Sequence, residues 1–311
     1  SPSVPINRTA ISDKLMMIIT LAALLQATPT PTVRDMLRML AIVAVPWGLV
    51  FAEPNLGTSL VFGAIAMGMF YWGNVNPGWL ILLFSPLIWV LLNNLSMPIW
   101  IGWVVMAGVI AWLSLPWQWL GTFATVVVNM VSGQVGQLFW GALKDYQKMR
   151  LTGFLSPEKD PLGSGYHLIQ SRIAIGAGEL KGRGLFQGTQ TQLNFIPEQH
   201  TDFIFSAIGE ELGFIGCIGV LFVFWIICLR LVIIAQTAND NFGSLLAIGV
   251  LSMLIFQVFV NIGMNIGLAP GTGIPLPFLS YGNASLLGNF LGLGLVESVA
   301  NRRQRKKMWN K

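Results

Sequence analysis

Nine apolar segments are the feature that most restricts what this chain can fold into. Most of them approach the ~20 residues that an α-helix needs to cross the ~30 Å hydrocarbon core of a membrane. Of the 311 residues, 54% are hydrophobic and only 10% are charged, which excludes the soluble globular class. We therefore expect an all-α fold, a polytopic transmembrane helix bundle of about nine helices. The segments are residues 16–26, 36–52, 56–72, 78–92, 98–114, 117–143, 203–235, 243–268 and 281–300.

The positions of lysine and arginine in the short connections predict how these helices are oriented. The C-terminus carries the strongest basic cluster and is therefore expected in the cytoplasm. Counting the helices back from it places the connection with Arg34 and Arg38 on the same side and the long segment at 144–201 outside. The net charge of +5 then reflects orientation and contact with anionic lipids rather than binding to nucleic acid. The cluster comprises Arg302, Arg303, Arg305, Lys306, Lys307 and Lys311.

An odd number of helices leaves the N-terminus outside, and the chain starts with Ser1 rather than methionine. We interpret this as a chain that lacks upstream helices, or as a mature fragment. A long outer loop separates the sixth and seventh helices, and loops of this length in compact proteins are commonly functional. We expect four parts: N-terminal transmembrane helices at 1–143, an outer, periplasmic loop at 144–202, C-terminal transmembrane helices at 203–300 and a basic cytoplasmic tail at 301–311.

The stretch NFIPEQHTDFIFSAIGEELGFIG, residues 194–216, carries acidic side chains from a polar loop into an apolar helix. Asp202 stands at the boundary, and Glu210 and Glu211 follow about two helical turns further in. An uncompensated charge in such a position costs several kcal/mol, so we expect a functional use. The alternatives are that Thr201 or Asp202 caps the helix, and that both glutamates lie in an interfacial first turn.

Three long motifs give this chain a resemblance to a known family. PEQHTDFIFSAIGEELG covers 197–213, VNIGMNIGLAPGTGIPLPFLSYG covers 260–282 and EPNLGTSLVFGA covers 53–64. In these motifs the chain resembles the SEDS family (shape, elongation, division and sporulation), in its RodA branch. The resemblance implies a ten-helix bundle with a large outer loop. It also implies a peptidoglycan glycosyltransferase that polymerises lipid II at the outer face of the bacterial cytoplasmic membrane during cell elongation and cell-shape maintenance.

The resemblance further implies partners and site residues. Lipid II is the expected substrate, and the expected partners are a class B penicillin-binding protein and other membrane proteins of the elongation complex. Asp202 matches the family's general base, which would take a proton from the acceptor hydroxyl. A divalent cation, Mg²⁺ or Mn²⁺, beside Asp202 and Asn55 is the only cofactor expected. The residues expected at the substrate are Lys14, Asn55, Arg172, Lys181, Arg183, Glu198, His200, Thr201, Glu211, Ser280 and Tyr281.

Several of these residues have a second, simpler interpretation. Lys14, Arg172, Lys181 and Arg183 would hold a pyrophosphate, but isolated charges of this kind are more often solvated. The segment at 269–285, between two helices, contains three prolines and three glycines. It forms either a partly re-entrant loop that lines the site or a plain outer hairpin.

The chain departs from the family pattern in four places. The first three family helices have no counterpart, and three apolar segments stand at 78–143 where the pattern has one. At the family's PSE-x-x-K motif, TAISDKLMM keeps Lys14 but has no glutamate, with Asp13 nearby. At its QPDLGTS motif, EPNLGTS has Asn55 in place of the aspartate. These departures leave open a non-catalytic scaffold of the elongation complex. A flippase or transporter of the lipid-linked precursor also stays open, because acidic residues inside helices and an apolar stretch broken by glycine and proline suit a translocation path.

Overall fold

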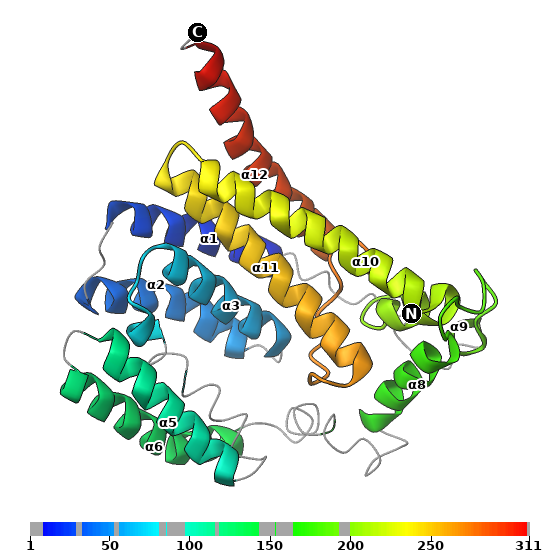
Figure 1. Ribbon diagram of the computed structural model, residues 1–311, viewed down its shortest axis with the longest axis horizontal. Coiled ribbons are helices and arrows are strands. Elements are labelled where there is room, and N and C mark those ends of the chain that lie inside the picture. Colours follow the sequence, from blue (N-terminus) through cyan, green and yellow to red (C-terminus); the bar gives the residue numbers. More distant parts are fainter. Residues whose placement is uncertain are drawn as a thin grey trace. The chain divides into compact units, whose positions relative to one another are not determined.

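The computed structural model describes residues 9–28, 33–52, 56–80, 85, 97–115, 118–142, 153, 164–192 and 200–309. Its helices are α1 (Thr9–Ala27), α2 (Val33–Ala52), α3 (Leu56–Trp72), α5 (Met97–Ser114), α6 (Gln118–Ala142), α8 (Ser164–Ala177), α9 (Thr189–Gln192), α10 (Ile204–Thr237), α11 (Asn241–Ile266) and α12 (Asn283–Trp309) (Figure 1). Every regular element among the described residues is a helix, which confirms the all-α prediction. Two of these helices, α10 and α11, are long and apolar enough to cross a membrane.

The chain forms two compact units. The second unit contains the hairpin of α5 and α6, and side-chain amides fasten it to its neighbouring segments. Asn76 donates to the carbonyl of Ser114 at 2.6 Å, and Asn129 on α6 donates to the hydroxyl of Ser85 at 2.9 Å. The first unit comprises residues 1–28, 32–69 and 149–311, and the second comprises residues 29–31 and 70–148.

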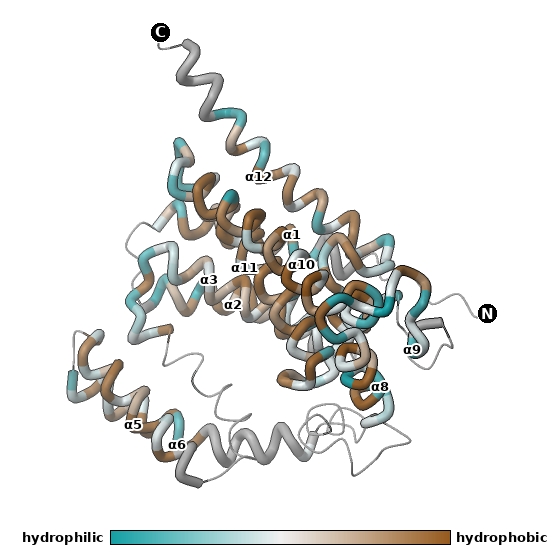
Figure 2. The backbone as a smooth tube through the Cα atoms, turned by 45° about the vertical axis from the view of Figure 1, so that its right-hand side comes forward, coloured by the Kyte–Doolittle hydropathy of each residue, from teal (hydrophilic) through white to brown (hydrophobic). Residues whose placement is uncertain are grey.

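Helix α11 forms the centre of the first unit. Of its apolar stretch 67% is buried, against 17% for α10, and it packs against α1, α8, α10 and α12. Helices α10 and α11 form a hairpin through the connection at 238–240 and lie side by side (Figure 1). Figure 2 shows hydrophobic residues along both helices. Helix α11 therefore supplies the interior, while most of α10 faces outward, as expected of a helix that contacts lipid or another protein.

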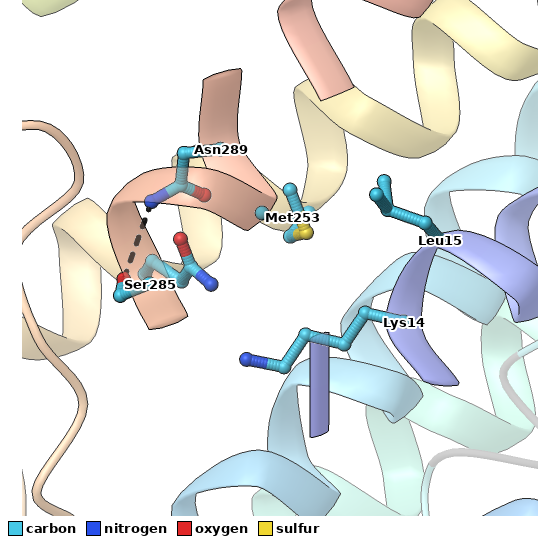
Figure 3. A pocket seen from close by; sticks show the side chains of 7 residues that line it. Lys14, Leu15, Met253, Ser285 and Asn289 are labelled. Carbon is cyan, nitrogen blue, oxygen red and sulfur yellow. Dashed lines mark hydrogen bonds between the residues drawn. The ribbon is translucent and has the colours of Figure 1, made fainter. Parts of the chain in front are cut away.

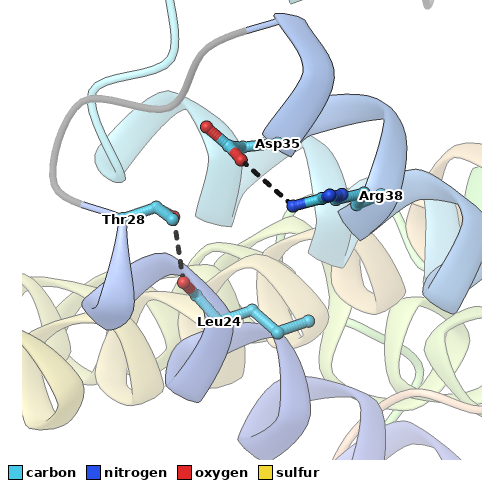
Figure 4. Close-up of polar contacts among 4 residues, drawn as sticks. All are labelled: Leu24, Thr28, Asp35 and Arg38. Carbon is cyan, nitrogen blue, oxygen red and sulfur yellow. Dashed lines mark hydrogen bonds and ion pairs between the residues drawn. The ribbon is translucent and has the colours of Figure 1, made fainter.

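The end of α1 and the start of α2 carry polar side chains (Figure 4). Thr28 donates from its hydroxyl to the carbonyl of Leu24 at 3.0 Å. In the first turns of α2, Arg38 and Asp35 form an ion pair at 4.0 Å, and the side chain of Arg38 is 64% exposed. An exposed ion pair of this spacing contributes about 0.5 kcal/mol or less to the stability of the protein. It keeps a basic residue in place at the start of α2.

The apolar pattern predicts most helix positions closely. Helix α10 covers Ile204–Thr237 where the pattern predicts 203–235, and α11 covers Asn241–Ile266 where it predicts 243–268. For these apolar helices the larger differences lie at the chain ends. Helix α1 begins at Thr9, and α12 continues to Trp309, so that most of the expected tail at 301–311 is helical. Lysine, arginine and glutamine favour a helix without raising its hydropathy, which is why the pattern stops short there.

The predicted outer loop at 144–202 contains two helices, α8 and the short α9. Helix α8 packs against α10 and α11. Its buried residues Leu168, Ser171 and Ala174 recur at every third position, the spacing of one helix face. A 14-residue helix of mixed polarity has no transmembrane signal, so hydropathy alone could not reveal it.

Helix α10 is interrupted at Gly213, which has φ of 67° and ψ of −165°. The carbonyls of Glu210 and Glu211 therefore lose their helical partners. The loop that follows α8 supplies replacements. The backbone amide of Arg183 donates to the carbonyl of Glu210 at 2.9 Å, and that of Gly184 donates to the carbonyl of Glu211 at 3.1 Å.

The same interruption frees two backbone amides on the other side of the break. Phe214 donates to the carbonyl of Glu179 at 2.9 Å, and Ile215 donates to the carbonyl of Leu180 at 3.2 Å. All four backbone groups released by the break are thus paired with the loop at 179–184. An interruption in a membrane helix requires such pairing, because lipid offers no substitute partners.

We expect Gly213→Ala to destabilise the protein. A Cβ at this position would overlap the amide nitrogen of Gly182, and a positive φ strains any residue other than glycine by about 1–3 kcal/mol. Gly219→Ala is the matched control, since that glycine lies on the same helix with open space around it and should be neutral or stabilising by up to ~1 kcal/mol. Thermal unfolding in detergent measures both, and equal melting temperatures would contradict the proposed role of the break.

Candidate functional site

The residues just before α10 are bound to the segment between α11 and α12. The carbonyl of His200 accepts from the backbone amide of Tyr281 at 2.7 Å, and the carbonyl of Thr201 accepts from the hydroxyl of Ser280. That hydroxyl also accepts from the amide of Leu276 at 2.7 Å. Ser280 is therefore buried and holds backbone in place, whereas the side chain of Tyr281 is 70% exposed and open to a ligand.

The backbone of Asp202 is held by two amides of α11. Its carbonyl accepts from Asn261 at 2.9 Å and from Asn265 at 3.0 Å. Asn261 donates in addition to the carbonyl of Ile274 at 2.8 Å. These bonds involve only the carbonyl of Asp202. Its position is therefore fixed independently of its half-buried carboxylate.

Asn265 also connects α8, α10 and α11. The hydroxyl of Ser206 donates to its side-chain oxygen, and the hydroxyl of Ser171 donates to its backbone carbonyl at 2.7 Å. The two hydroxyls are in contact with each other. All three residues are fully buried. A satisfied polar network of this kind fixes how three helices pack, because each member loses a partner if one helix shifts.

Two glycines bring further segments close to Asp202. A Cβ at Gly273, where φ is 68°, would lie 3.3 Å from a carboxylate oxygen of Asp202. The neighbouring carbonyl of Thr272 would lie 2.5 Å from a Cβ at Gly57, near the start of α3. The described parts of the three motifs at 53–64, 197–213 and 260–282 therefore meet around Asp202. The segment at 267–282 folds into the unit, with Ile274 and Leu276 buried, rather than forming a plain outer hairpin.

Helix capping does not explain Thr201 or Asp202. The N-cap of α10 is Phe203, and no side-chain capping hydrogen bond is formed there. The capping alternative is therefore wrong.

A stripe of three amides on α11 is the feature that sequence reasoning missed. Gln257, Asn261 and Asn265 recur at every fourth position and are each at most 2% exposed. Residues at this spacing lie on one face of a helix. Amides inside an apolar membrane helix need hydrogen-bond partners, so their spacing could have indicated a polar interface.

Lys14, the predicted pyrophosphate ligand from the N-terminal region, is half-buried on α1. It lines a small pocket with Gln257 of α11 and with Ser285 and Asn289 of α12. Its side chain extends from α1 toward the side of the pocket where Ser285 and Asn289 lie (Figure 3). Gln257 belongs to the same stripe as the amides that hold Asp202.

Arg172 belongs to α8, and its guanidinium lies at the C-terminal end of α11. Its guanidinium donates to the carbonyl of Gly267 at 3.1 Å, and Gly267 has φ of 80° at the helix C-cap. A Cβ at Gly267 would overlap the guanidinium, so this position requires glycine. A cation here also stabilises the helix dipole. The exposed guanidinium keeps other donors for a ligand.

Arg183 and Glu210 belong to one network around α9. Arg183 donates to the carbonyl of Ala177 at 3.2 Å and to the hydroxyl of Thr189 at 2.8 Å. The fully buried carboxylate of Glu210 accepts from the amide of Gln190 at 2.8 Å and from the hydroxyl of Thr189 at 3.4 Å. Glu210 therefore anchors α9 to α10. Helix α10 begins at Ile204 and its first turn contains no acidic residue, so the interpretation of both glutamates as residues of a first turn is wrong.

The remaining predicted residues are placed as follows. Lys181 and His200 are exposed, and Glu211 is half-buried. Asn55 and Glu198 lie outside the described residues, so their expected roles stay predictions. Among the described residues, no three histidine, cysteine, aspartate or glutamate side chains gather as metal ligands. A divalent cation beside Asp202 and Asn55 likewise stays a prediction.

Comparison with known proteins decides the family. A family model described as cell cycle protein, FtsW/RodA/SpoVE, matches residues 12–97 and 75–305. The chain belongs to this family. The match confirms the resemblance carried by the three motifs. Together with the two apolar spans of α10 and α11, it makes the chain an integral membrane protein.

Two curated relatives match this chain over part of their own length. It is 36% identical over 274 residues to peptidoglycan glycosyltransferase MrdB of Escherichia coli (strain K12), which covers 88% of this chain and 62% of MrdB. It is 46% identical over 182 residues to peptidoglycan glycosyltransferase RodA of Treponema pallidum (strain Nichols), which covers 58% of this chain and 42% of that protein. The chain thus spans less than two thirds of the curated relatives that it matches.

Solved structures support the same fold. A chain of a peptidoglycan synthase complex, described as coordinating polymerization and crosslinking, superimposes with a TM-score of 0.67 at 27% identity, covering 94% of this chain and 70% of that one. The crystal structure of the rod shape determining protein RodA of Thermus thermophilus gives a TM-score of 0.50 at 24% identity, covering 91% and 62%. The second likeness concerns the fold alone.

We expect Asn265→Leu to destabilise the first unit of this family member. The change leaves the carbonyl of Asp202 with one amide fewer and removes the acceptor of Ser206, and a buried polar group without a partner costs about 1–3 kcal/mol. Ile266→Leu, at the next and exposed position, is the control. The measurement is thermal unfolding in detergent, and an unchanged melting temperature for Asn265→Leu would show that the network is dispensable.

Proposed function

We propose that this chain is a peptidoglycan glycosyltransferase that polymerises lipid II into glycan strands during cell elongation and cell-shape maintenance. The observation that carries the proposal is the position of Asp202. Its backbone is held by Asn261 and Asn265, while its carboxylate adjoins Gly273 at the junction of three motifs. The names of MrdB and RodA, both peptidoglycan glycosyltransferases, support this choice of reaction.

In the proposed reaction Asp202 acts as general base. The acceptor sugar's hydroxyl loses its proton to the carboxylate as its oxygen forms a bond to the anomeric carbon of the donor. The bond from that carbon to the lipid pyrophosphate breaks, and the electron pair leaves with the pyrophosphate. A positioned general base contributes about 10² to 10⁴ in rate.

The place of Asp202 in the chain suits an amphipathic substrate. It lies two residues before α10, the helix with the greatest apolar length, and follows a stretch of polar sequence. The sugar of a lipid-linked precursor lies in water while its polyprenyl tail lies in hydrocarbon. A base for this reaction therefore has to stand where the two media meet.

Cations must offset the charge of the departing pyrophosphate. Lys14, Arg172 and Lys181 are the groups that we assign to this role. Arg172 and Lys181 are exposed, and Arg172 uses only part of its guanidinium at the end of α11. Arg183 is instead engaged with Thr189 beside the buried Glu210, and we expect a structural contribution from it.

The proposed partners are a class B penicillin-binding protein, which would crosslink the strands, and other membrane proteins of the elongation complex. The solved complex, in which polymerization and crosslinking are coordinated, supports this pairing. The outward face of α10 offers Phe214, Phe222 and Trp225 to lipid or to a neighbouring transmembrane helix. The proposed location is the bacterial cytoplasmic membrane, with the C-terminus in the cytoplasm.

Purified protein supplied with labelled lipid II tests this proposal against the two alternatives. Glycan chains indicate the glycosyltransferase. Transfer of lipid II between bilayer leaflets without glycan chains would indicate a flippase. Partner binding without either activity would indicate a non-catalytic scaffold, which Asn55 and the missing glutamate before Lys14 would then explain.

We expect Asp202→Asn to abolish most activity while keeping the fold. The backbone carbonyl that α11 holds is unchanged by the substitution, but a neutral amide cannot take the proton, so the rate should fall by about 10² or more. Lipid II polymerisation and thermal unfolding measure the two effects. Asp240→Asn, at the N-cap of α11, is the matched control and should leave the rate unchanged. Near-normal synthesis by Asp202→Asn would remove this residue from the mechanism.

We expect Lys181 to lie on the outer side of the membrane and Asn301 in the cytoplasm. The basic clusters in the short connections and the C-terminal tail predict this orientation. Both residues are exposed and suitable for single cysteine substitutions in a background with Cys217→Ala and Cys228→Ala. An impermeant thiol reagent should label Lys181→Cys in intact cells, and Asn301→Cys only after the membrane is opened. The reverse pattern would overturn both the orientation and the proposed chemistry.

A further inference from the structure

A small pocket lies among α1, α11 and α12 of the first unit (Figure 3). Its volume of about 20 Å³ decides what it can hold. One water molecule needs roughly 10–15 Å³, whereas a phosphate or a sugar needs far more. The pocket is therefore the size of one water. Its lining residues are Lys14, Leu15, Met253, Gln257, Ser285, Gly288 and Asn289.

The polar groups of the lining match the hydrogen bonds of a water. Gln257 is 2% exposed, and its side-chain oxygen has no hydrogen-bond partner among the described residues. Buried acceptors of this kind are normally paired, often with an ordered water. The side-chain amide of Asn289 donates to the hydroxyl of Ser285 at 3.4 Å, so the hydrogen of that hydroxyl can be donated elsewhere.

Lys14 supplies the charged group of the pocket. Within the part of the chain that the structure describes, it forms no ion pair with a carboxylate. Its ammonium donates hydrogen bonds but accepts none, and Gln257 offers an acceptor in the same pocket. A water between the two groups would connect the donor to the acceptor. Without such a bridge, the oxygen of Gln257 stays unpaired in an apolar helix.

We propose that the pocket holds one ordered water that accepts hydrogen bonds from Lys14 and Ser285 and donates one to Gln257. These are three bonds, the usual number for a buried water. Gln257 and Ser285 are then positioning residues, which act through the water to fix the ammonium of Lys14. The functional part of this inference rests on the proposed glycosyltransferase activity, in which Lys14 meets the pyrophosphate.

The inference gives the amide stripe of α11 a single role. Gln257 lies one helical turn from Asn261, and Asn261 and Asn265 hold the backbone of Asp202. One face of α11 would therefore position both the base and a cation of the reaction. If two different helices held the base and the cation, the distance between these groups would depend on how the two helices pack.

The first test is structural and does not depend on activity. An experimental map of the full chain that resolves ordered waters should show a peak within hydrogen-bond distance of Gln257, Ser285 and Lys14. The peak should disappear in Gln257→Met, a side chain of similar length without a strong acceptor. A dry pocket in the unaltered protein would overturn the proposal.

The second test is a double-mutant cycle in the polymerisation of lipid II. Gln257→Met should lower kcat/KM by up to about tenfold, as expected for the loss of one hydrogen bond to the bridging water, whereas Gln257→Glu, which keeps an acceptor, should retain most of the activity. In a Lys14→Met background Gln257→Met should have no further effect on kcat/KM, because the ammonium that Gln257 positions is absent. Equal losses in both backgrounds would reduce Gln257 to a structural role and overturn the positioning claim.

A matched control separates positioning from packing. Asn129→Met removes another buried amide, in the second unit, and should lower the melting temperature. Any change that it causes in kcat/KM should be the same with Lys14 present as in the Lys14→Met background. If the unaltered protein makes no glycan at all, the proposed function fails. The water peak and its loss in Gln257→Met then still decide whether the site exists.

Discussion

The hydrogen bonds from Asn261 and Asn265 to the carbonyl of Asp202 are the interaction on which the first unit depends. Two amides inside an apolar helix must find partners, because unpaired polar groups are costly where water is absent. Here they bind the backbone at the start of α10 and, through Ile274, the segment after α11. The need to satisfy α11 thus fixes the backbone position of the one residue whose carboxylate we assign to the chemistry.

A second restraint acts about three turns further along the chain. The break at Gly213 would leave four backbone groups unpaired, and the loop at 179–184 pairs all of them. The buried carboxylate of Glu210 holds α9 beside the same break. Helix α10 is therefore fixed at its start by α11 and at its break by the loop. Gln190 of α9 and the backbone at 200–202 are thus both attached to the helix bundle.

Much of the fold follows from hydropathy alone. The runs that became α10 and α11 are apolar over their whole length, so their positions agree with the structure at both ends. Hydropathy did not predict α8, because a short helix of mixed polarity has no transmembrane signal. Its buried face also includes the polar residue Ser171. The interpretation of Glu210 as a first-turn residue failed for a different reason. Helix α10 begins at Ile204, and the carboxylate of Glu210 is bound by Gln190 of α9, a contact that hydropathy does not reveal.

The sequence by itself determined that this is a helical membrane protein of the FtsW/RodA/SpoVE family and that Asp202 stands where a polar loop enters an apolar helix. These properties depend on local composition and on contiguous motifs. Only the tertiary structure decided that Asn261 and Asn265 hold Asp202, that Ser280 holds Thr201, and that Gln257 and Lys14 line one pocket. Such pairs join residues far apart in the chain. A helix's own periodicity shows which residues share its face, but the partner of that face is fixed only when the helices pack.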